Sequence, residues 1–390
     1  MDSATADRVR AVISKLGMSN KEFAEAIGMP VDQLSKALNG KRRLSAFELA
    51  VIADLGSTTV DWLSTGTQRQ RLGLAARAIG LETVEYEDEA QQIASRFANA
   101  AEVLIELGIR PEPEALPQLK QNGWFVDEGE AMAKWALEQL NPDVLLTSTV
   151  ELVSAVEEAF GVDIANSTEL PVGFDGLSFQ NDHLRLILLL TTENWTRRRF
   201  TLAHELGHVL WADARDYALA EELRPGIDNS HKEKRANAFA AAFLMPESLI
   251  EQEVAGEKVT VELFHRLILR FKVSPSSMAV RLNKLGLLDQ VTFARFRRFR
   301  TRDSIDATGS SKIEAQEIAA AQAAWAPTHM VADFLTAYRE GRITSKPLVE
   351  LTGQPEWAWR ELLNDDLDLY LAQPGIDLDL PSEDEDIYAP

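Results

Sequence analysis

Two histidines four residues apart, with a glutamate directly after the first, are the residues best suited to do chemistry: His204, Glu205 and His208. On a helix, positions i and i+4 lie on one face, so both imidazoles would point at the same place. Such a pair supplies two ligands to a zinc ion, and the glutamate beside it can take a proton from zinc-bound water. The spacing predicts a zinc hydrolase with Glu205 as its general base.

A catalytic zinc site needs a third protein ligand and an open position for water. The sequence has no cysteine, which leaves histidine and carboxylate as ligands and excludes disulfides and thiol nucleophiles. Glu233 is the best candidate, because it begins an alanine-rich predicted helix whose small side chains allow close approach to the first helix. His231 is an alternative ligand that is better explained as a loop or cap residue. Asn237, one turn after Glu233, is a candidate hydrogen-bond partner of the ligands.

The elements that must position these residues follow from hydrophobic periodicity. Apolar alternation predicts short strands at residues 162–164 and 176–180, and a more buried strand at 183–191, directly before the zinc helix. A peptide substrate could enter extended, as an added strand beside residues 183–191. Helices are predicted around this small sheet, at residues 83–106, 130–140, 152–160, 232–244, 261–271 and 277–285.

The first 66 residues predict a separate domain of five short helices, at residues 6–16, 20–27, 31–38, 46–55 and 60–63. The second and third, joined by a tight turn, fit a helix-turn-helix. Gln33 is a plausible reader of adenine and Lys36 of guanine, and Asn20 is expected to contact the DNA backbone. The complete set of predicted DNA-binding residues is Asn20, Gln33, Ser35, Lys36, Lys41, Arg42 and Arg43.

This segment holds 8 basic and 8 acidic side chains, a balance that predicts weak nonspecific affinity for DNA. A helical dimerisation module without an operator is therefore the alternative interpretation. The whole chain carries a formal charge of −21, which argues against coating nucleic acid and leaves DNA binding to local patches. The start of the chain lacks a secretory signal, and its most apolar run, residues 184–190, is too short to span a membrane. We expect a cytoplasmic protein.

The remaining segments predict a linker at residues 67–84, of which residues 68–80 are expected to form a basic helix, a helical region at 291–370 and an acidic, solvated tail at 371–390. Phenylalanines and arginines interleave over residues 293–302. They could grip nucleic acid, but phenylalanines three residues apart favour an apolar helical stripe that docks on the rest of the protein.

Residues 200–208, 233, 236–241 and 244–246 together resemble the ImmA/IrrE metallopeptidases. Residues 160–162 and 176–178 upstream, and 273–274 and 281–286 downstream, are also similar, so the resemblance covers roughly residues 85–290. It implies Zn²⁺ on His204, His208 and Glu233, with Glu205 as base, in a family that cuts helix-turn-helix repressors. One departure is the absence of the usual asparagine before the zinc helix, at residues 190–192. Residues 1–66 resemble the Xre/Cro-like repressor domain.

Together these features predict an α+β, mostly α protein: a five-helix helix-turn-helix domain (1–66), a zincin-like metallopeptidase domain with a small sheet (85–290) and a helical extension. The predicted function is a regulator that binds a double-stranded DNA operator and cleaves a cytoplasmic repressor or partner protein. The alternative is a non-proteolytic transcription factor, or an antitoxin-like regulator, whose zincin-like domain serves sensing or dimerisation. A homodimer is possible under either hypothesis.

Overall fold

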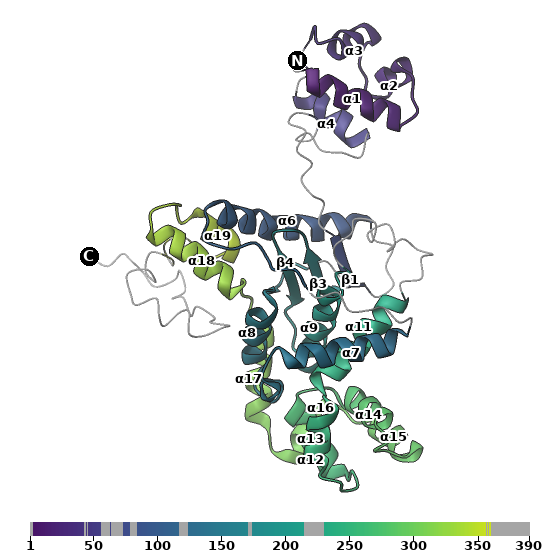
Figure 1. Cartoon of the computed structure of the whole chain (residues 1–390), viewed down its shortest axis with the longest axis vertical. Helices are drawn as coiled ribbons and strands as arrows, with labels where there is room; N and C mark the ends of the chain where they lie inside the picture. The colour runs from purple at the N-terminus through teal and green to yellow at the C-terminus, as the bar shows by residue number, and fades with distance from the viewer. Residues whose placement is uncertain are drawn as a thin grey trace, which may run out of the picture. The chain divides into compact units, whose positions relative to one another are not determined.

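The structure of this chain is a computed structural model. It describes residues 3–42, 44, 46–55, 63, 73–78, 84–116, 124–170, 174–213, 230–355, 357 and 359. The chain divides into two units, Met1–Arg71 and Leu72–Pro390 (Figure 1). The described part is mostly helical with one small sheet, so the predicted α+β, mostly α class is confirmed. None of the described helices is both long and apolar enough to cross a bilayer.

The N-terminal unit contains four of the predicted helices. They are α1 (Ser3–Lys15), α2 (Asn20–Ala26), α3 (Val31–Leu38) and α4 (Ala46–Leu55). A capping box begins α2, because the Glu22 N–H donates to the Ser19 hydroxyl (3.3 Å) while the Ser19 N–H donates to the Glu22 carboxylate (2.8 Å). Phe23 and Leu34 are fully buried, as expected for a helix-turn-helix core. The predicted fifth helix lies outside the described residues, except for the buried Leu63.

A four-stranded mixed sheet forms the centre of the second unit. Its strands lie in the order β1 (Gly73–Ala78), β3 (Phe174–Gln180), β4 (Arg185–Leu190) and β2 (Asp163–Ser167). β2 pairs parallel to β4, and the other two pairings are antiparallel. The three strands predicted upstream of the zinc helix are therefore confirmed. The expectation that a substrate strand adds beside residues 183–191 is wrong, because β4 is hydrogen-bonded on both sides.

β1 corrects a second expectation, since residues 68–80 were predicted to be helical. Residues 73–78 instead pair with β3 from Gly73 opposite Gln180 to Ala78 opposite Phe174. Alanine favours a helix by less than about 1 kcal/mol per residue over most other residue types. The backbone hydrogen bonds offered by the free edge of β3 outweigh that preference.

Helices cover both faces of the sheet. Leu186 and Leu188 of β4 belong to a core formed with α6 (Val84–Glu106) and two C-terminal helices, whereas Ile187 and Leu189 face the helices that carry the candidate metal ligands. This alternation buries β4 on both faces. The other helices of this unit are α7 (Phe125–Glu138), α8 (Thr149–Phe160), α9 (Trp195–Leu210), α11 (Ser230–Leu244), α12 (Glu247–Val254), α13 (Val261–Phe271), α14 (Pro275–Lys284), α15 (Gln290–Phe296), α16 (Thr301–Thr308), α17 (Ser311–Gln322), α18 (Thr328–Arg339) and α19 (Lys346–Thr352), with a short 3₁₀ helix at Pro142–Leu146 (Figure 1).

The phenylalanine stripe predicted at residues 293–302 packs against the rest of this unit. Phe296 is buried and stacks on Phe264 of α13, with ring centroids 4.2 Å apart. Phe293 and Phe299 are partly buried against the same core. The docking interpretation is therefore confirmed, and the phenylalanine rings are not free to stack on bases.

The helical region after residue 290 completes the sheet. The N–H groups of Asn166 in β2 and of Trp325 each donate to the other's carbonyl, at 2.9 Å in both directions. Glu317 of α17 accepts hydrogen bonds from the Thr149 hydroxyl (2.6 Å) and backbone N–H (3.3 Å) at the start of α8. The acidic tail at residues 371–390 lies outside the described residues.

A buried carboxyl beneath β2 predicts a pH-dependent stability. Burial raises the pKa of Glu157 from 4.5 to about 8, against the hydrogen bond that it accepts from the Ile164 N–H (3.1 Å). Between these two values the folded state holds a proton that the unfolded state releases, so the free energy of unfolding falls as pH rises, by at most about 1.4 kcal/mol per pH unit. Glu157→Gln, which stays neutral and keeps the acceptor, should make this slope shallower in urea unfolding compared at about pH 5.5 and about pH 7.5. Glu158→Gln, at an exposed neighbour, should leave it unchanged.

Candidate metal centre

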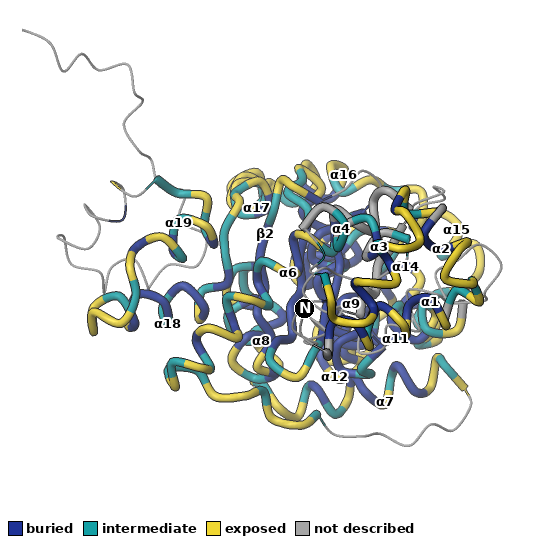
Figure 2. The backbone as a smooth tube through the Cα atoms, turned by 90° about the horizontal axis from the view of Figure 1, so that it is seen from above, coloured by how far each residue is buried: buried dark blue, intermediate teal, exposed yellow. Residues whose placement is uncertain are grey.

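The helix that carries the HExxH pattern is α9, which lies in the interior of the unit (Figure 2). Its N-terminus is capped by Asn194, whose side chain accepts a hydrogen bond from the Arg197 N–H (3.2 Å). Leu202, Leu206 and Val209 pack into the main hydrophobic core and fix the rotation of the helix. That rotation directs the other face, with its two histidines, toward α11.

The two imidazoles and the Glu233 carboxylate converge on one point. The Nε2 atoms of His204 and His208 are 3.1 Å apart, and the Glu233 oxygens lie 3.3 Å from the first and 3.2 Å from the second. Ligand atoms about 2.0 Å from a tetrahedral zinc lie about 3.3 Å from one another. The donor set and its spacing therefore fit a zinc ion with three protein ligands. Within the described residues, this is the group of ligand side chains that could hold a metal.

The charges around this point favour a cation. Burial lowers the pKa of His208, but its hydrogen bonds to Asp213 and Glu233 outweigh burial and raise the pKa to about 10. Burial likewise raises the pKa of Glu233, and the hydrogen bonds to both histidines outweigh it, so this pKa lies well below its usual value. The carboxylates around this point thus stabilise positive charge where the imidazole nitrogens meet.

Glycines bring the ligand helices close together. A Cβ atom on Gly207 would lie 3.0 Å from the Phe239 ring and 3.4 Å from the Ala236 Cα of α11. On the far side of α11, a Cβ on Gly129 of α7 would lie 2.4 Å from the Arg235 carbonyl oxygen. Two helices can pack this closely on α11 only because these positions lack side chains, and this packing holds Glu233 opposite the histidines.

Glu205 lies beside the ligands and contacts β3. The Ser178 hydroxyl donates to its Oε2 at 2.9 Å, whereas Oε1 has no hydrogen-bond partner among the described residues. Burial raises the pKa of this carboxyl. Gly176 makes the approach possible, because a Cβ there would lie 2.6 Å from the Thr201 side chain and 3.3 Å from Glu205 Cγ. One carboxylate oxygen is held in place and the other remains available to a proton.

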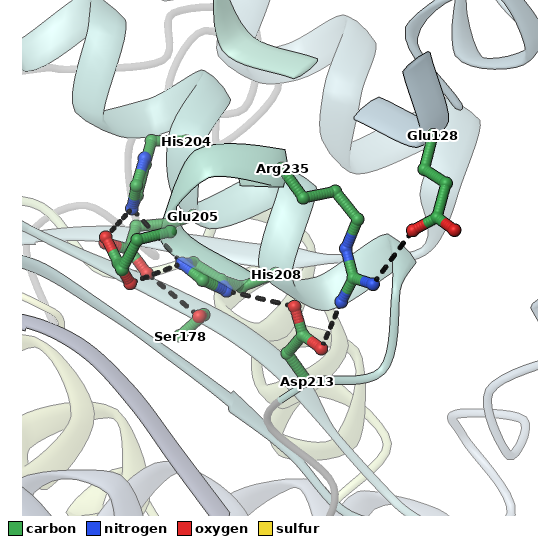
Figure 3. Close-up of polar contacts among 8 residues, drawn as sticks. Glu128, Ser178, His204, Glu205, His208, Asp213 and Arg235 are labelled. Atoms are coloured by element: carbon green, nitrogen blue, oxygen red, sulfur yellow. Dashed lines mark hydrogen bonds and ion pairs between the residues drawn. The ribbon is translucent and has the colours of Figure 1, made fainter. Parts of the chain in front are cut away.

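Asp213, Arg235 and Glu128 form a series of charged side chains that begins at His208, and the sequence analysis did not predict it (Figure 3). Asp213 accepts from His208 Nδ1 at 3.2 Å and from Arg235 at 2.7 Å, and Arg235 also lies 3.5 Å from the Glu128 carboxylate. The guanidinium stacks over the Trp211 ring, 4.2 Å from its centroid. A carboxylate bound to the outer nitrogen of a ligand histidine fixes its tautomer and orientation.

The two other residues singled out near the third ligand differ in their surroundings. Asn237 is half-buried on α11 and its side chain forms no hydrogen bond with the described residues, so its supporting role stays a prediction. His231 is exposed and stacks on Phe125, with ring centroids 4.0 Å apart. The alternative ligand is therefore not among the side chains that converge, and Asp213 occupies the supporting position.

The predicted DNA-binding residues lie mainly on the surface of the N-terminal unit. Asn20, Ser35, Lys36 and Lys41 are exposed, and Gln33 is half-buried on α3. Two of the cations already have partners, since Lys36 pairs with Asp32 at 3.0 Å and the half-buried Arg42 pairs with Glu48 at 2.6 Å. Arg43 lies outside the described residues. Their contacts with DNA remain predictions.

Removing the charge of Asp213 should weaken metal binding. Asp213→Asn loses the anion that pairs with both His208 and Arg235, so we expect the zinc dissociation constant to rise roughly 10- to 100-fold. Competition with a coloured zinc chelator measures it. Glu253→Gln, which breaks an exposed pair with Arg270, is the matched control and should leave the constant unchanged. Equal zinc affinity in Asp213→Asn and the parent chain would contradict the supporting role.

Comparison with known proteins finds matches to two domain families. Residues 158–283 match the IrrE N-terminal-like domain, a peptidase family (M78), and residues 9–63 match a helix-turn-helix family. Over 122 residues the chain is 33% identical to the radiation response metalloprotease IrrE of Deinococcus radiodurans. That match covers 30% of this chain and 35% of the relative, so it spans about a third of the relative's length. Both resemblances seen in the sequence are confirmed: the chain carries an IrrE N-terminal-like domain of the M78 peptidase family and, before it, a helix-turn-helix domain.

Proposed function

We propose that this protein is a DNA-binding regulator whose second unit is a zinc-dependent peptidase. The observation that carries the proposal is the convergence of His204, His208 and Glu233, with ligand atoms 3.1–3.3 Å apart, beside a buried Glu205. A site that only holds a structural zinc has no use for such a base. Zinc bound there would supply water that is acidic enough to ionise near neutral pH.

Each side chain at the site has its own role in the proposed hydrolysis. Glu205 takes the proton from the attacking water and passes it to the amine that leaves. Ser178 holds one oxygen of that carboxylate, which keeps the other directed to the reacting atoms. Asp213 and Arg235 keep His208 in the tautomer whose Nε2 faces the ligand point.

The two domains support the choice of substrate. A helix-turn-helix domain and a peptidase-family domain in one chain fit a regulator that acts on transcription. The matched relative is named a metalloprotease of the radiation response, which supports peptide cleavage under stress. We infer that the substrate is a cytoplasmic repressor or another partner protein, reached while the N-terminal unit binds a double-stranded operator.

Metal removal tests the peptidase. The purified chain is stripped with a chelator, reloaded with zinc and added to a lysate of cells that lack it, and newly formed protein N-termini are labelled and sequenced. We expect about one zinc per chain after reloading and a small set of new N-termini that the stripped protein does not produce. Zinc binding without any new N-terminus would favour the non-proteolytic, sensing alternative. A chain that takes up no zinc would overturn the peptidase proposal.

A further inference from the structure

The edge of the sheet beside Glu205 is occupied by the chain itself. β3 carries Ser178, whose hydroxyl holds Glu205, and the far side of β3 pairs with β1. Ala75 of β1 lies directly opposite Ser178. β1 begins two residues after Arg71, where the N-terminal unit ends. The segment that follows the helix-turn-helix domain thus lies along the strand that touches the candidate base.

The pairing of β1 with β3 is irregular near Glu205, the candidate base. Ala76 lies opposite Leu177 and Ala78 opposite Phe174, so a single residue of β1 faces both Asp175 and Gly176. A bulge of this kind bends a strand and increases its twist. Gly176 is the position at which β3 comes within contact distance of Glu205 Cγ. The disturbance in the ladder therefore coincides with the point where β3 meets the reacting groups.

Among the described residues, β4 and β2 already have partners on the sides that a peptide would need. β4 pairs with β3 on one side and β2 on the other. The outer side of β2 is bridged at Asn166 by Trp325, with hydrogen bonds in both directions. An extended peptide that joins this sheet next to Glu205 must therefore pair with β3, in the place that β1 holds.

We propose that β1 is an internal competitor for the peptide-binding site of the peptidase, and that an extended polypeptide substrate binds by replacing β1 along β3. This inference rests on the proposed peptidase function and adds where, and in what form, the substrate binds. The substrate pairs antiparallel to β3, as β1 does, and main-chain hydrogen bonds supply much of its affinity.

Competition from a tethered strand has a defined effect. A segment of the same chain acts at an effective concentration of about millimolar, so the apparent affinity of a free peptide equals its intrinsic affinity multiplied by the fraction of molecules in which β1 is unpaired. Anything that shifts β1 off β3 raises peptide affinity without changing a residue of the site. The helix-turn-helix domain is joined to this strand through the chain, so the two activities share one covalent link.

A disulfide lock tests the proposal, and the absence of cysteine from the chain makes it specific. Gly73→Cys with Gln180→Cys places two thiols at paired positions away from Glu205, at the separation that antiparallel neighbours and disulfides share. The probe is a fluorescent peptide with the sequence of residues 71–80, and its binding to the zinc-loaded full chain is followed by anisotropy. All variants also carry Glu205→Gln, so the readout needs no hydrolysis.

We expect the oxidised lock to bind the probe at least about tenfold more weakly than its reduced form, with zinc content unchanged, because β1 can no longer leave. Each single-cysteine variant should show no such redox dependence. Equal probe binding by the oxidised and reduced forms would overturn the proposal, as would a failure of the two cysteines to form the disulfide. If the chain binds the probe in this redox-dependent way but the parent protein cleaves nothing in the lysate, the proposal that β1 competes with peptides stands and the proposed peptidase function fails.

Proline variants give a second test in the opposite direction. In an edge strand, alternate N–H groups point to the neighbouring strand, so of Ala75→Pro and Ala76→Pro one removes a ladder hydrogen bond and the other is its matched control. We expect one of the two to bind the probe roughly two- to tenfold more tightly than the parent chain, the factor for one hydrogen bond. If both bind it no more tightly than the parent, β1 does not compete for this edge.

Discussion

Glu205→Gln is expected to lower kcat/KM for peptide cleavage roughly 10²- to 10⁴-fold, the contribution of a positioned general base. Glutamine has nearly the same shape and still accepts a hydrogen bond from the Ser178 hydroxyl, but it cannot take a proton from water. The three ligand side chains are untouched, so zinc content should remain that of the parent chain. Cleavage of a substrate identified from the lysate, measured alongside metal analysis, checks both halves of the expectation.

Ser178→Ala is the matched control for this substitution. It removes only the hydrogen bond to Oε2 of Glu205 and keeps the carboxylate, so the loss should be nearer to tenfold. If Glu205→Gln cleaves as fast as Ser178→Ala, the proton is carried by another group. If Glu205→Gln also loses zinc, the substitution has disturbed the three ligand side chains. The loss of cleavage then gives no support to Glu205 as the general base.

Glu317→Gln is expected to destabilise the second unit by about 3 kcal/mol, because it leaves buried cations without their nearest buried anion. Arg199 is fully buried on α9 and donates to the Thr149 hydroxyl (3.0 Å), which in turn donates to Glu317. Burial lowers the pKa values of Arg198 and Arg199 to about 10, and the Glu317 charge acts against that lowering. Glutamine still has an oxygen that accepts the hydrogen bond from Thr149, so the loss of stability measures the contribution of the carboxylate charge.

Urea unfolding at neutral pH measures this loss. Glu314→Gln on the same helix is the control, since its partner Arg302 is 63% exposed and a pair of that kind contributes at most about 1 kcal/mol. Equal midpoints for the two variants would show that the buried cluster is not held by the Glu317 carboxylate.

Local sequence patterns were sufficient to predict the helix that carries the candidate site. The spacing of His204, Glu205 and His208 and the uncharged residues that flank them indicated α9, because two residues four apart on a helix share a face. The same reasoning located α3, α4 and α13 with the bounds that the structure has. Glu233 was found by the chemistry of a third ligand and the small residues after it, which also produce the close contact of α11 with α9 at Gly207.

What could not be predicted depends on contacts between distant segments. The role of Asp213 requires the turn after α9 to bring a carboxylate back under His208 and against Arg235, 22 residues further along the chain. β1 forms only because β3 offers it an edge, and its own alanines favour a helix. Neither arrangement leaves a periodic signal in the sequence, although a carboxylate five residues after the second histidine could have been noted.

The helices beyond residue 290 have a consequence for where the peptidase-family domain ends as a folding unit. The family match stops at residue 283, yet Trp325 pairs with Asn166 on the outer side of β2, and the charge of Glu317 acts on the buried Arg198 and Arg199 of α9. A chain cut at the family boundary would expose a strand edge, which invites aggregation, and would leave buried charge uncompensated. Recombination or gene fusion at that boundary is therefore unfavourable. The smallest fragment that retains the fold extends at least to α18.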